Sequence, residues 1–376
     1  MKIGILTFFC GPNYGAMLQS FSLWHYLEDR GHEVEFIDYP LGGTRRGPLW
    51  RCFINRRGLN EFGIIKNKLK NYVRFSIARF SESFPKSCMI SSFKGLADIS
   101  KQYDCVVVGS DQVWNPAWCT PQSLPILMLD FVNKGTKRIS YAASFGTSVW
   151  RIDQNAGMAA MFLRRFDAIS VREKSGVRVV RDLCGRSDAK WLLDPTLLHV
   201  AQFYLGIASQ RKYTEPYICS YILDEWSDDA TIERLLKRVK KMCGISIVRT
   251  DRTNVAGLLS PICRYFNVET KIPVADWLSL IANSGFVVTN SFHGTVFSIL
   301  FHKPFVTVLL KGSNSGMNER VVSLLQLLNL ENRMVEADEQ ALSEDIVSGV
   351  IPWDDIDDRL VKRRIDTDLF FSEMGL

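Results

Sequence analysis

Residues 2–40 read KIGILTFFCGPNYGAMLQSFSLWHYLEDRGHEVEFIDYP, and this stretch decides the fold. Residues 2–8 form an almost unbroken apolar run, which is typical of a strand buried on both faces. A helix is expected over 16–29, and the alternating pattern of 33–39 predicts a second strand. A strand, a helix and a strand in this order indicate a parallel sheet covered by helices.

The same alternation of strands and helices continues along the chain. Further strands are expected at 103–108, 137–144, 167–171, 217–223, 245–249, 286–289 and 304–309, and further helices at 153–165, 173–183, 229–242, 274–283, after 290 to about 301, and at 317–328. We predict two α/β domains, 1–196 and 197–376, with a basic insertion at 44–80 in the first domain. Ligands of such sheets bind beyond the carboxyl ends of the strands, so we expect the site in a cleft between the domains.

Composition excludes several classes of protein. The chain has 376 residues, of which 47% are hydrophobic and 23% charged, so it is neither disordered nor collagen-like. Nine cysteines without a CxxC pair indicate reduced thiols in a cytoplasmic protein and no metal site. The chain lacks a P-loop, a GxGxxG motif, a secretory signal pattern and any apolar run of about 18 residues. These absences argue against ATP hydrolysis, NAD binding, secretion and a membrane span.

Charge is concentrated in one segment. The chain carries a net charge of +6, yet residues 44–80 hold ten basic residues and one acidic residue, a net charge of +9. Apolar and aromatic side chains alternate with the basic ones, as in segments that contact a membrane surface. A solvated basic face explains the pattern equally well. We expect either this face or a peripheral membrane contact, and no nucleic-acid partner.

Two segments that follow predicted strands carry polar side chains suited to a ligand. Asn13-Tyr14-Gly15 lies between the first strand and its helix, where glycine permits close approach and the helix N-terminus favours anions. A plain turn is the alternative. Residues 109–116 read GSDQVWNP, in which Ser110, Asp111 and Trp114 are candidate substrate contacts. Asp111 either accepts the proton of a sugar hydroxyl or caps the next turn, and Trp114 offers a face for sugar stacking.

The remaining two segments carry the catalytic candidates. Arg172 ends a predicted strand, where its guanidinium group suits a carboxylate or phosphate, or else pairs with Glu173 or a nearby aspartate. Residues 290–295 read NSFHGT, and His293 is expected in the first turn of a helix whose free N–H groups attract phosphate. There His293 can act as a proton donor, although a lone histidine is more often structural. Further contacts are expected from the rest of that segment: Asn290, Ser291, Gly294 and Thr295.

With these motifs assembled, the chain resembles the polysaccharide pyruvyl transferase family. The resemblance covers residues 1 to about 330 and rests on seven motifs in order: KIGIL at 2–6, NYGAMLQ at 13–19, VVGSDQVWNP at 107–116, SYAASFG at 140–146, SVRE at 170–173, LDPT at 193–196 and NSFHGT at 290–295.

The resemblance implies an α/β fold with two Rossmann-like domains facing a cleft, similar to GT-B glycosyltransferases. It implies transfer of the pyruvyl group of phosphoenolpyruvate to two hydroxyls of a sugar in a polysaccharide or its lipid-linked precursor. The product is a cyclic ketal, as in exopolysaccharide or capsule biosynthesis, and no cofactor is needed. Arg172 and His293 match residues that the family needs for activity. Where members often carry an arginine two residues before the histidine, this chain has Ser291, and Lys311 or Arg320 are candidates to replace that arginine.

Two other functions remain open at this stage. A GT-B glycosyltransferase that uses a sugar nucleotide would place a diphosphate in the same anion site. A non-catalytic member of the family would bind glycan without turnover. The acceptor sugar and the hydroxyls used are not encoded in any motif that we identify.

Overall fold

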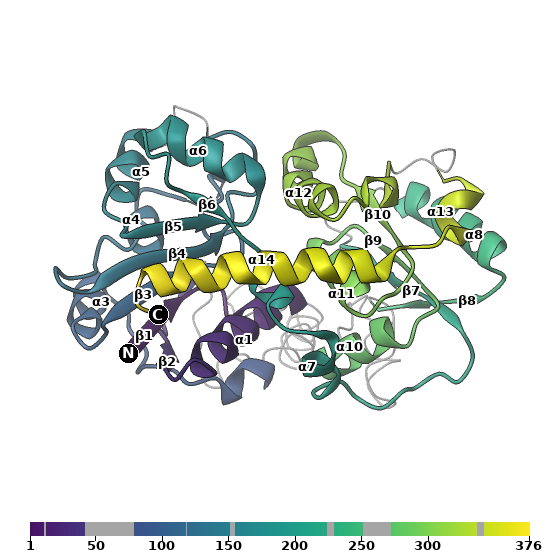
Figure 1. The fold of residues 1–376 in the computed structure, drawn as a ribbon, viewed down its shortest axis with the longest axis horizontal. Helices are drawn as coiled ribbons and strands as arrows, with labels where there is room; N and C mark the ends of the chain where they lie inside the picture. The colour runs from purple at the N-terminus through teal and green to yellow at the C-terminus, as the bar shows by residue number, and fades with distance from the viewer. Residues whose placement is uncertain are drawn as a thin grey trace, which may run out of the picture.

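The computed structural model describes residues 1–10, 13–41, 79–117, 119–150, 155–223, 229–250, 272–336 and 342–376. Within these ranges the chain forms two parallel sheets flanked by helices and set side by side (Figure 1). The strand order is β2-β1-β3-β4-β5-β6 in the first sheet and β11-β10-β9-β7-β8 in the second. The predicted α/β class with two domains is therefore confirmed.

The first sheet and its helices come from the first half of the chain. The strands are β1 (Lys2–Leu6), β2 (Glu33–Phe36), β3 (Cys105–Val108), β4 (Lys137–Ala143), β5 (Ala168–Val171) and β6 (Lys190–Trp191). The helices are α1 (Tyr14–Glu28), α3 (Phe93–Ser100), α4 (Leu124–Leu127), α5 (Ala156–Leu163) and α6 (Lys174–Cys184). The interiors of β3 and β5 are buried throughout, as their continuous apolar sequences predict.

The second sheet follows after the connecting helix α7 (Ala201–Leu205). Its strands are β7 (Tyr217–Tyr221), β8 (Ser246–Arg249), β9 (Phe286–Thr289), β10 (Phe305–Leu309) and β11 (Met334–Glu336). Its helices are α8 (Asp229–Cys243), α10 (Val274–Ala282), α11 (Phe292–Leu300), α12 (Glu319–Leu327) and α13 (Glu344–Ser348), and the chain ends with α14 (Trp353–Glu373). The boundary between the sheets falls between Trp191 and Tyr217, a range that contains the predicted boundary at 196.

The strand orders locate the ligand-binding edges. In the first sheet the order reverses direction between β1 and β3, and in the second between β7 and β9. The crevice outside the carboxyl ends of the strands at such a switch point is where open α/β sheets bind ligands. The loops after β1, β3 and β9 carry three of the four segments singled out in the sequence, so the topology places these three at switch points, and Arg172 follows β5.

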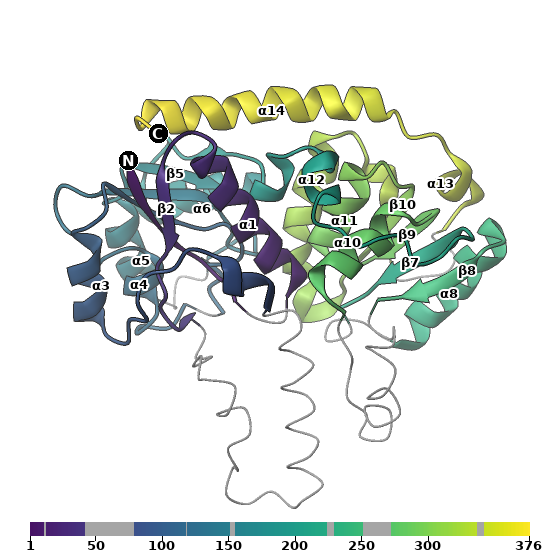
Figure 2. The same ribbon diagram turned by 90° about the horizontal axis from the view of Figure 1, so that it is seen from below.

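Helix α14 returns from the second domain to the first, which the sequence analysis did not predict. It lies across both domains, with its C-terminal end beside the first sheet (Figures 1 and 2). Tyr141 stacks on Phe371 with ring centroids 4.9 Å apart, and the Tyr26 hydroxyl donates a hydrogen bond to Asp368 at 2.5 Å. Assigning all of 197–376 to the second domain is therefore wrong for α14, because much of this helix packs on the first domain.

The two domains share a continuous apolar core. One cluster of buried side chains extends from β1 and α1 in the first domain to α10 and α11 in the second. At this boundary Tyr14 stacks on Trp277 with ring centroids 5.0 Å apart, and the Tyr14 hydroxyl donates to the Ile272 carbonyl at 2.8 Å. The packing holds the loop after β1 against the second domain.

The basic insertion predicted at 44–80 lies outside the described residues except for Arg79 and Phe80. None of the helices within the described ranges has both the length and the apolar character needed to span a bilayer.

Candidate active site

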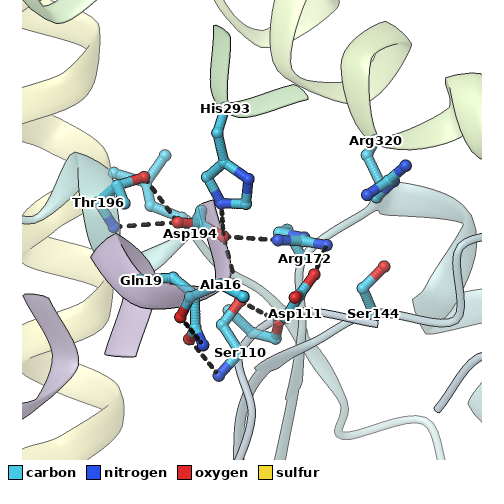
Figure 3. Close-up of polar contacts among 12 residues, drawn as sticks. Ala16, Gln19, Ser110, Asp111, Ser144, Arg172, Asp194, Thr196, His293 and Arg320 are labelled. Atoms are coloured by element: carbon cyan, nitrogen blue, oxygen red, sulfur yellow. Dashed lines mark hydrogen bonds and ion pairs between the residues drawn. The ribbon is translucent and has the colours of Figure 1, made fainter. Parts of the chain in front are cut away.

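His293 lies where β9 turns into α11, as predicted. Ser291 caps the helix, because its hydroxyl accepts a hydrogen bond from the Gly294 N–H at 3.4 Å. Gly294 lets the helix start close to β9, since a Cβ at that position would lie 2.3 Å from the Thr289 hydroxyl. The imidazole projects from the helix N-terminus toward the first domain, with 8% of its side chain exposed (Figure 3).

The imidazole faces a fully buried carboxylate, that of Asp194. His293 Nε2 lies 3.6 Å from Asp194 Oδ2, and the same oxygen accepts hydrogen bonds from Arg172 Nη1 at 2.8 Å and from the Ser110 hydroxyl at 3.1 Å. The other oxygen, Oδ1, accepts from the Thr196 N–H at 3.0 Å and the Thr196 hydroxyl at 2.6 Å. One side chain thus connects residues from both domains (Figure 3).

The charges around Asp194 keep it ionised. Burial alone would raise the pKa of Asp194, but His293 and Arg172 outweigh burial and hold that pKa well below its ordinary range. Burial would likewise lower the pKa of Arg172, yet the carboxylates of Asp194 and Asp111 raise it above its usual value. Both members of the pair are therefore charged at neutral pH.

Arg172 comes from the carboxyl end of β5 and is 1% exposed. Besides its contact with Asp194, its Nη2 lies 3.4 Å from Asp111 Oδ1, and its guanidinium lies 4.7 Å from the centre of the Phe292 ring. The alternative pairing with Glu173 does not occur, because Glu173 accepts hydrogen bonds from the backbone N–H groups of Phe145 and Gly146. The two carboxylates that pair with Arg172 are both aspartates.

Arg320, from α12, supplies a second buried guanidinium beside Arg172. It lies 6.0 Å from the centre of the Phe292 ring, and its Nε donates to the Met317 carbonyl at 3.3 Å. With its amide oxygen turned toward Arg320, Gln112 accepts from Nη1 at 2.8 Å and Nη2 at 3.2 Å. Within the described ranges no carboxylate forms a direct ion pair with Arg320, although Asp111, Glu173 and Asp194 are near enough to favour its charged form. Burial and the neighbouring Arg172 lower the pKa of Arg320 to about 10, so it remains a cation at neutral pH.

The two candidates to replace the missing arginine therefore differ. Arg320 is buried next to Arg172, whereas the side chain of Lys311 is 58% exposed and pairs with Glu336 at 3.6 Å. The structure favours Arg320 over Lys311 as the replacement, because Lys311 lies at the surface and pairs there with Glu336. Ser291 caps the helix and carries no charge, so Arg320 is the buried cation that could replace the missing arginine.

The segment Asn13-Tyr14-Gly15 lies against His293. A Cβ on Gly15 would be 1.9 Å from Nδ1, 2.4 Å from Cγ and 2.5 Å from Cε1 of the imidazole, so only glycine fits there. Asn13 caps α1 by accepting from the Ala16 N–H at 3.2 Å. The Tyr14 side chain is buried in the domain boundary described above and is not free to contact a substrate, which corrects its predicted role.

Several other predicted contacts have structural roles instead. Trp114 is fully buried, its indole N–H donates to the Leu127 carbonyl at 3.0 Å, and its ring packs on Phe145 and Phe166, so the prediction of sugar stacking is wrong. The Asn290 amide binds the backbone of Leu223, and the Thr295 hydroxyl lies 2.7 Å from that of Thr307. These side chains support the strand ends and do not face the charged cluster, which is formed by Asp194, Arg172, His293 and Arg320.

Asp111 does face the cluster, and its backbone explains how. It has a φ of 67°, in the left-handed region, and its carbonyl accepts from the N–H groups of Val113 and Ser144 at 2.8 and 2.9 Å. The turn is thereby closed at the end of β3 and the carboxylate is directed to Arg172. The residues that the structure describes contain no group of histidine, cysteine and acidic side chains suited to a metal ion.

Sequence reasoning missed Asp194 as a site residue. A signal was present, since residues 193–196 form one of the motifs of the resemblance. The sequence around Asp194 does not show, however, which distant residues contact its carboxylate. Only the folded chain shows that both Arg172 and His293 converge on it.

Comparison with known proteins connects this geometry to a family. The sequence model of the polysaccharide pyruvyl transferase family matches residues 13–311, most of the chain. A comparison with curated proteins finds no significant match.

Solved structures show where the fold occurs elsewhere. A proposed UDP-N-acetylglucosamine 2-epimerase from Listeria monocytogenes superposes with a TM-score of 0.51 and 9% identity, over 96% of this chain and 90% of that one. Another UDP-N-acetylglucosamine 2-epimerase has the same score and identity, over 99% of this chain and 96% of its own. At such low identity the likeness concerns the fold alone, and it confirms the predicted GT-B arrangement of two Rossmann-like domains.

Proposed function

Because the chain belongs to the polysaccharide pyruvyl transferase family, we propose that it transfers the pyruvyl group of phosphoenolpyruvate to two hydroxyls of one sugar. The product is a cyclic pyruvate ketal, and phosphate is released. One observation carries the proposal: Arg320 is a buried cation that forms no direct ion pair within the described chain, set beside Arg172 and across from His293. A buried charge without a partner is costly, and an anionic ligand would compensate it.

The donor carries two anionic groups, a carboxylate and a phosphate, and the site offers two guanidinium groups. Guanidinium groups bind both kinds of anion through paired N–H donors. The first N–H groups of α11 add a third site of positive potential beside Phe292. Arg172 is already paired with Asp194, but its 3.4 Å contact with Asp111 is long enough for a ligand oxygen to replace it. Arg320 and Arg172 together therefore match the charge of the donor.

The reaction requires no change of oxidation state. C3 of the donor gains a proton, C2 forms two bonds to sugar oxygens, and the bond from C2 to the phosphate oxygen breaks. Both sugar O–H bonds break as well: one proton balances the proton added to C3, and the other leaves with the phosphate. We assign proton delivery to His293, which stands at the helix N-terminus. The intermediate is an oxocarbenium ion at C2, and the neighbouring carboxylates of Asp194 and Asp111 favour positive charge there.

Asp111 is our candidate to receive a proton from the acceptor. Its carboxylate is partly exposed, with 14% of the side chain accessible, while the rest of the cluster is more deeply buried. Of the two carboxylates that contact Arg172, it is the one that an acceptor hydroxyl can reach. Asp194 is fully buried and cannot serve as this base.

The direct test is a reaction with purified protein, phosphoenolpyruvate and a panel of glycosides and lipid-linked glycans. We expect phosphate release that depends on the acceptor, together with a mass gain of one pyruvate ketal on the glycan. Donor labelled with carbon-13 in the pyruvyl group identifies the source of that mass. Transfer of a sugar from a nucleotide donor would show a glycosyltransferase, and tight glycan binding with no turnover would show a non-catalytic member.

We also propose that the acceptor is presented at the cytoplasmic face of a membrane and that residues 44–80 bring the enzyme there. This segment lies outside the described residues apart from Arg79 and Phe80, so the proposal rests on its net charge of +9. Each basic residue near an anionic membrane contributes about 1 kcal/mol, and salt weakens the attraction.

Co-sedimentation with anionic and neutral liposomes at low and physiological salt tests this proposal. We expect binding to anionic vesicles that falls with salt and falls again when five arginines are changed to glutamine: Arg45, Arg46, Arg51, Arg56 and Arg57. Binding that ignores both lipid charge and these changes would remove the membrane contact and leave the catalytic proposal untouched.

A further inference from the structure

Asp194 occupies the segment that joins the two domains, three residues after β6 ends. Both of its oxygens are in use, since Oδ1 accepts from Thr196 and Oδ2 faces Arg172, Ser110 and His293. The side chain is fully buried, so no water competes for these contacts. A buried carboxylate with so many donors is fixed in place, and it fixes its partners in return.

The partners of Oδ2 come from different domains. Arg172 follows β5 in the first domain, and His293 belongs to α11 in the second. Two groups that carry positive charge during the proposed reaction therefore meet at a single oxygen (Figure 3). The histidine of the second domain therefore faces an anion that already holds the arginine of the first domain.

The orientation of the imidazole shows which nitrogen is available. Nε2 is buried, points to Asp194 and has no hydrogen-bond partner in the described part of the chain. The hypothetical Cβ of Gly15 lies nearest to Nδ1 and almost equally far from Cγ and Cε1, which places Gly15 over the face of the ring. The in-plane direction from Nδ1 is therefore not blocked by Gly15. In Figure 3 this nitrogen points to the side on which Arg320 lies.

We propose that Asp194 is a positioning residue that holds the His293 ring with Nε2–H toward its carboxylate, so that the imidazolium gives its Nδ1 proton to C3 of the donor and keeps the proton on Nε2. The same carboxylate fixes the guanidinium of Arg172. This inference rests on the proposed function for its catalytic part. The 3.6 Å separation exceeds a hydrogen bond, and contacts of this kind often tighten only when substrate is bound.

A purely structural role for Asp194 makes a different prediction. If Asp194 only neutralises Arg172, its removal weakens donor binding and stability but leaves the histidine unaffected. If it also positions His293, its removal lowers turnover only in a protein that still has His293. Donor KM reports the first effect and kcat the second, which allows the two to be separated.

The test uses Asp194→Asn, which keeps the shape and removes the charge. We expect kcat to fall about 10²- to 10⁴-fold, as when an aspartate that orients a catalytic histidine is removed. In a His293→Ala background the same substitution should change kcat by about threefold or less, because residues that act as a unit are not additive. Asp182→Asn, an exposed carboxylate on α6, is the matched control and should leave kcat unchanged.

A second measurement does not depend on turnover. Nitrogen-15 spectra of histidine-labelled protein, recorded as a pH titration, report which ring nitrogen keeps its proton once the imidazole is neutral. We expect the His293 signal to show Nε2–H in wild type, and to lose that preference in Asp194→Asn but not in Asp182→Asn. The spectra test the positioning of His293 even if the protein is inactive with phosphoenolpyruvate. Such inactivity would contradict the proposed function but not the positioning role of Asp194.

Circular dichroism establishes that each variant is folded, and Asp194→Glu keeps the charge if the asparagine variant unfolds. In that case the glutamate variant should retain the Nε2–H signal while kcat falls, because its carboxylate is displaced. An unchanged His293 signal in folded Asp194→Asn would overturn the proposal. Equal losses of kcat with and without His293 would also overturn it.

Discussion

The two sides of the candidate site hold the same kind of cation in opposite electrostatic settings. On the side of the first domain, Arg172 is matched by Asp194 at 2.8 Å and Asp111 at 3.4 Å. On the side of the second domain, Arg320 is also buried, but within the described chain it hydrogen-bonds only to neutral groups. The nearby carboxylates act on it without a direct ion pair. Both guanidinium groups lie near one ring, that of Phe292. The first domain thus supplies an arginine that is neutralised by ion pairs. The second supplies a cation without a direct ion pair in the described chain, which an anionic ligand could neutralise.

This difference suggests a division of work between the domains. A neutralised arginine contributes mainly to the shape of the site, whereas an unmatched buried cation stores electrostatic attraction for a ligand. We therefore expect the donor to bind chiefly to the second domain, and the acceptor hydroxyls to approach Asp111 in the first. Substitutions on the two sides should consequently have different effects on turnover, donor binding and stability.

The largest effect is expected at His293. His293→Ala should reduce kcat about 10²- to 10⁴-fold while leaving the fold intact, because it removes the proton donor on the donor side of the site. His302→Ala is the matched control: His302 is more exposed, stacks on Trp353 and pairs with Asp357 at 3.1 Å, beyond the C-terminal end of α11. Steady-state kinetics with both variants provide the measurement. Wild-type turnover in folded His293→Ala would exclude His293 as the proton donor.

The next largest effect is expected at Arg172 and Arg320. Substituting each of them tests most directly whether their electrostatic settings differ. Arg172→Met leaves Asp194 buried without its closest cation and should lower the free energy of unfolding by about 3–5 kcal/mol. Arg320→Met removes a buried cation that forms no direct ion pair in the described residues, so the free energy of unfolding should stay the same or rise.

Urea unfolding of both variants, with and without phosphoenolpyruvate, measures these differences. The donor should stabilise the wild type and should fail to stabilise Arg320→Met, because a ligand stabilises only the state that it binds. Lys311→Met serves as the surface control and should respond to the donor as wild type does. Equal destabilisation by Arg172→Met and Arg320→Met would mean that the two cations are not in different settings.

The regular elements that position the site could be predicted because their sequences carry strong local signals. The strand at 286–289 matches β9 residue for residue, and the helix predicted at 274–283 corresponds to α10. The short strands β6 and β11 escaped prediction, since two or three residues are too few to show alternation. Helix α14 escaped because its sequence is crowded with charges, and its buried side chains acquire meaning only where the first domain covers them.

The site itself was only partly predictable. His293, Arg172 and Asp111 could be found because each follows a strand, and parallel strands deliver such residues to one edge. The sugar-stacking prediction for Trp114 was wrong. Its position after β3 suggested an exposed ring, but the ring is buried in the core. Asp194 and the contrast between Arg320 and Lys311 depend on contacts between distant segments, which no local pattern records.

The smallest of these effects is expected at Gly15, where the first domain touches the catalytic ring. A Cβ at Gly15 would lie 1.9 Å from His293 Nδ1, so Gly15→Ala must displace either α1 or the imidazole. A displacement of about 1 Å at a catalytic group can cost roughly 10²-fold in rate. We expect a loss of this size in kcat.

Gly157→Ala, in α5, is the matched control. A Cβ at Gly157 meets nothing within 4 Å, and alanine in a helix is more stable than glycine by about 0.5–1 kcal/mol, so this variant should be active and slightly more stable. Kinetics and thermal unfolding of the pair separate a clash at the site from a general effect of adding a methyl group. If Gly15→Ala kept full activity, the ring of His293 would be free to move away from the first domain. The contact between the two sides would then not be needed for catalysis.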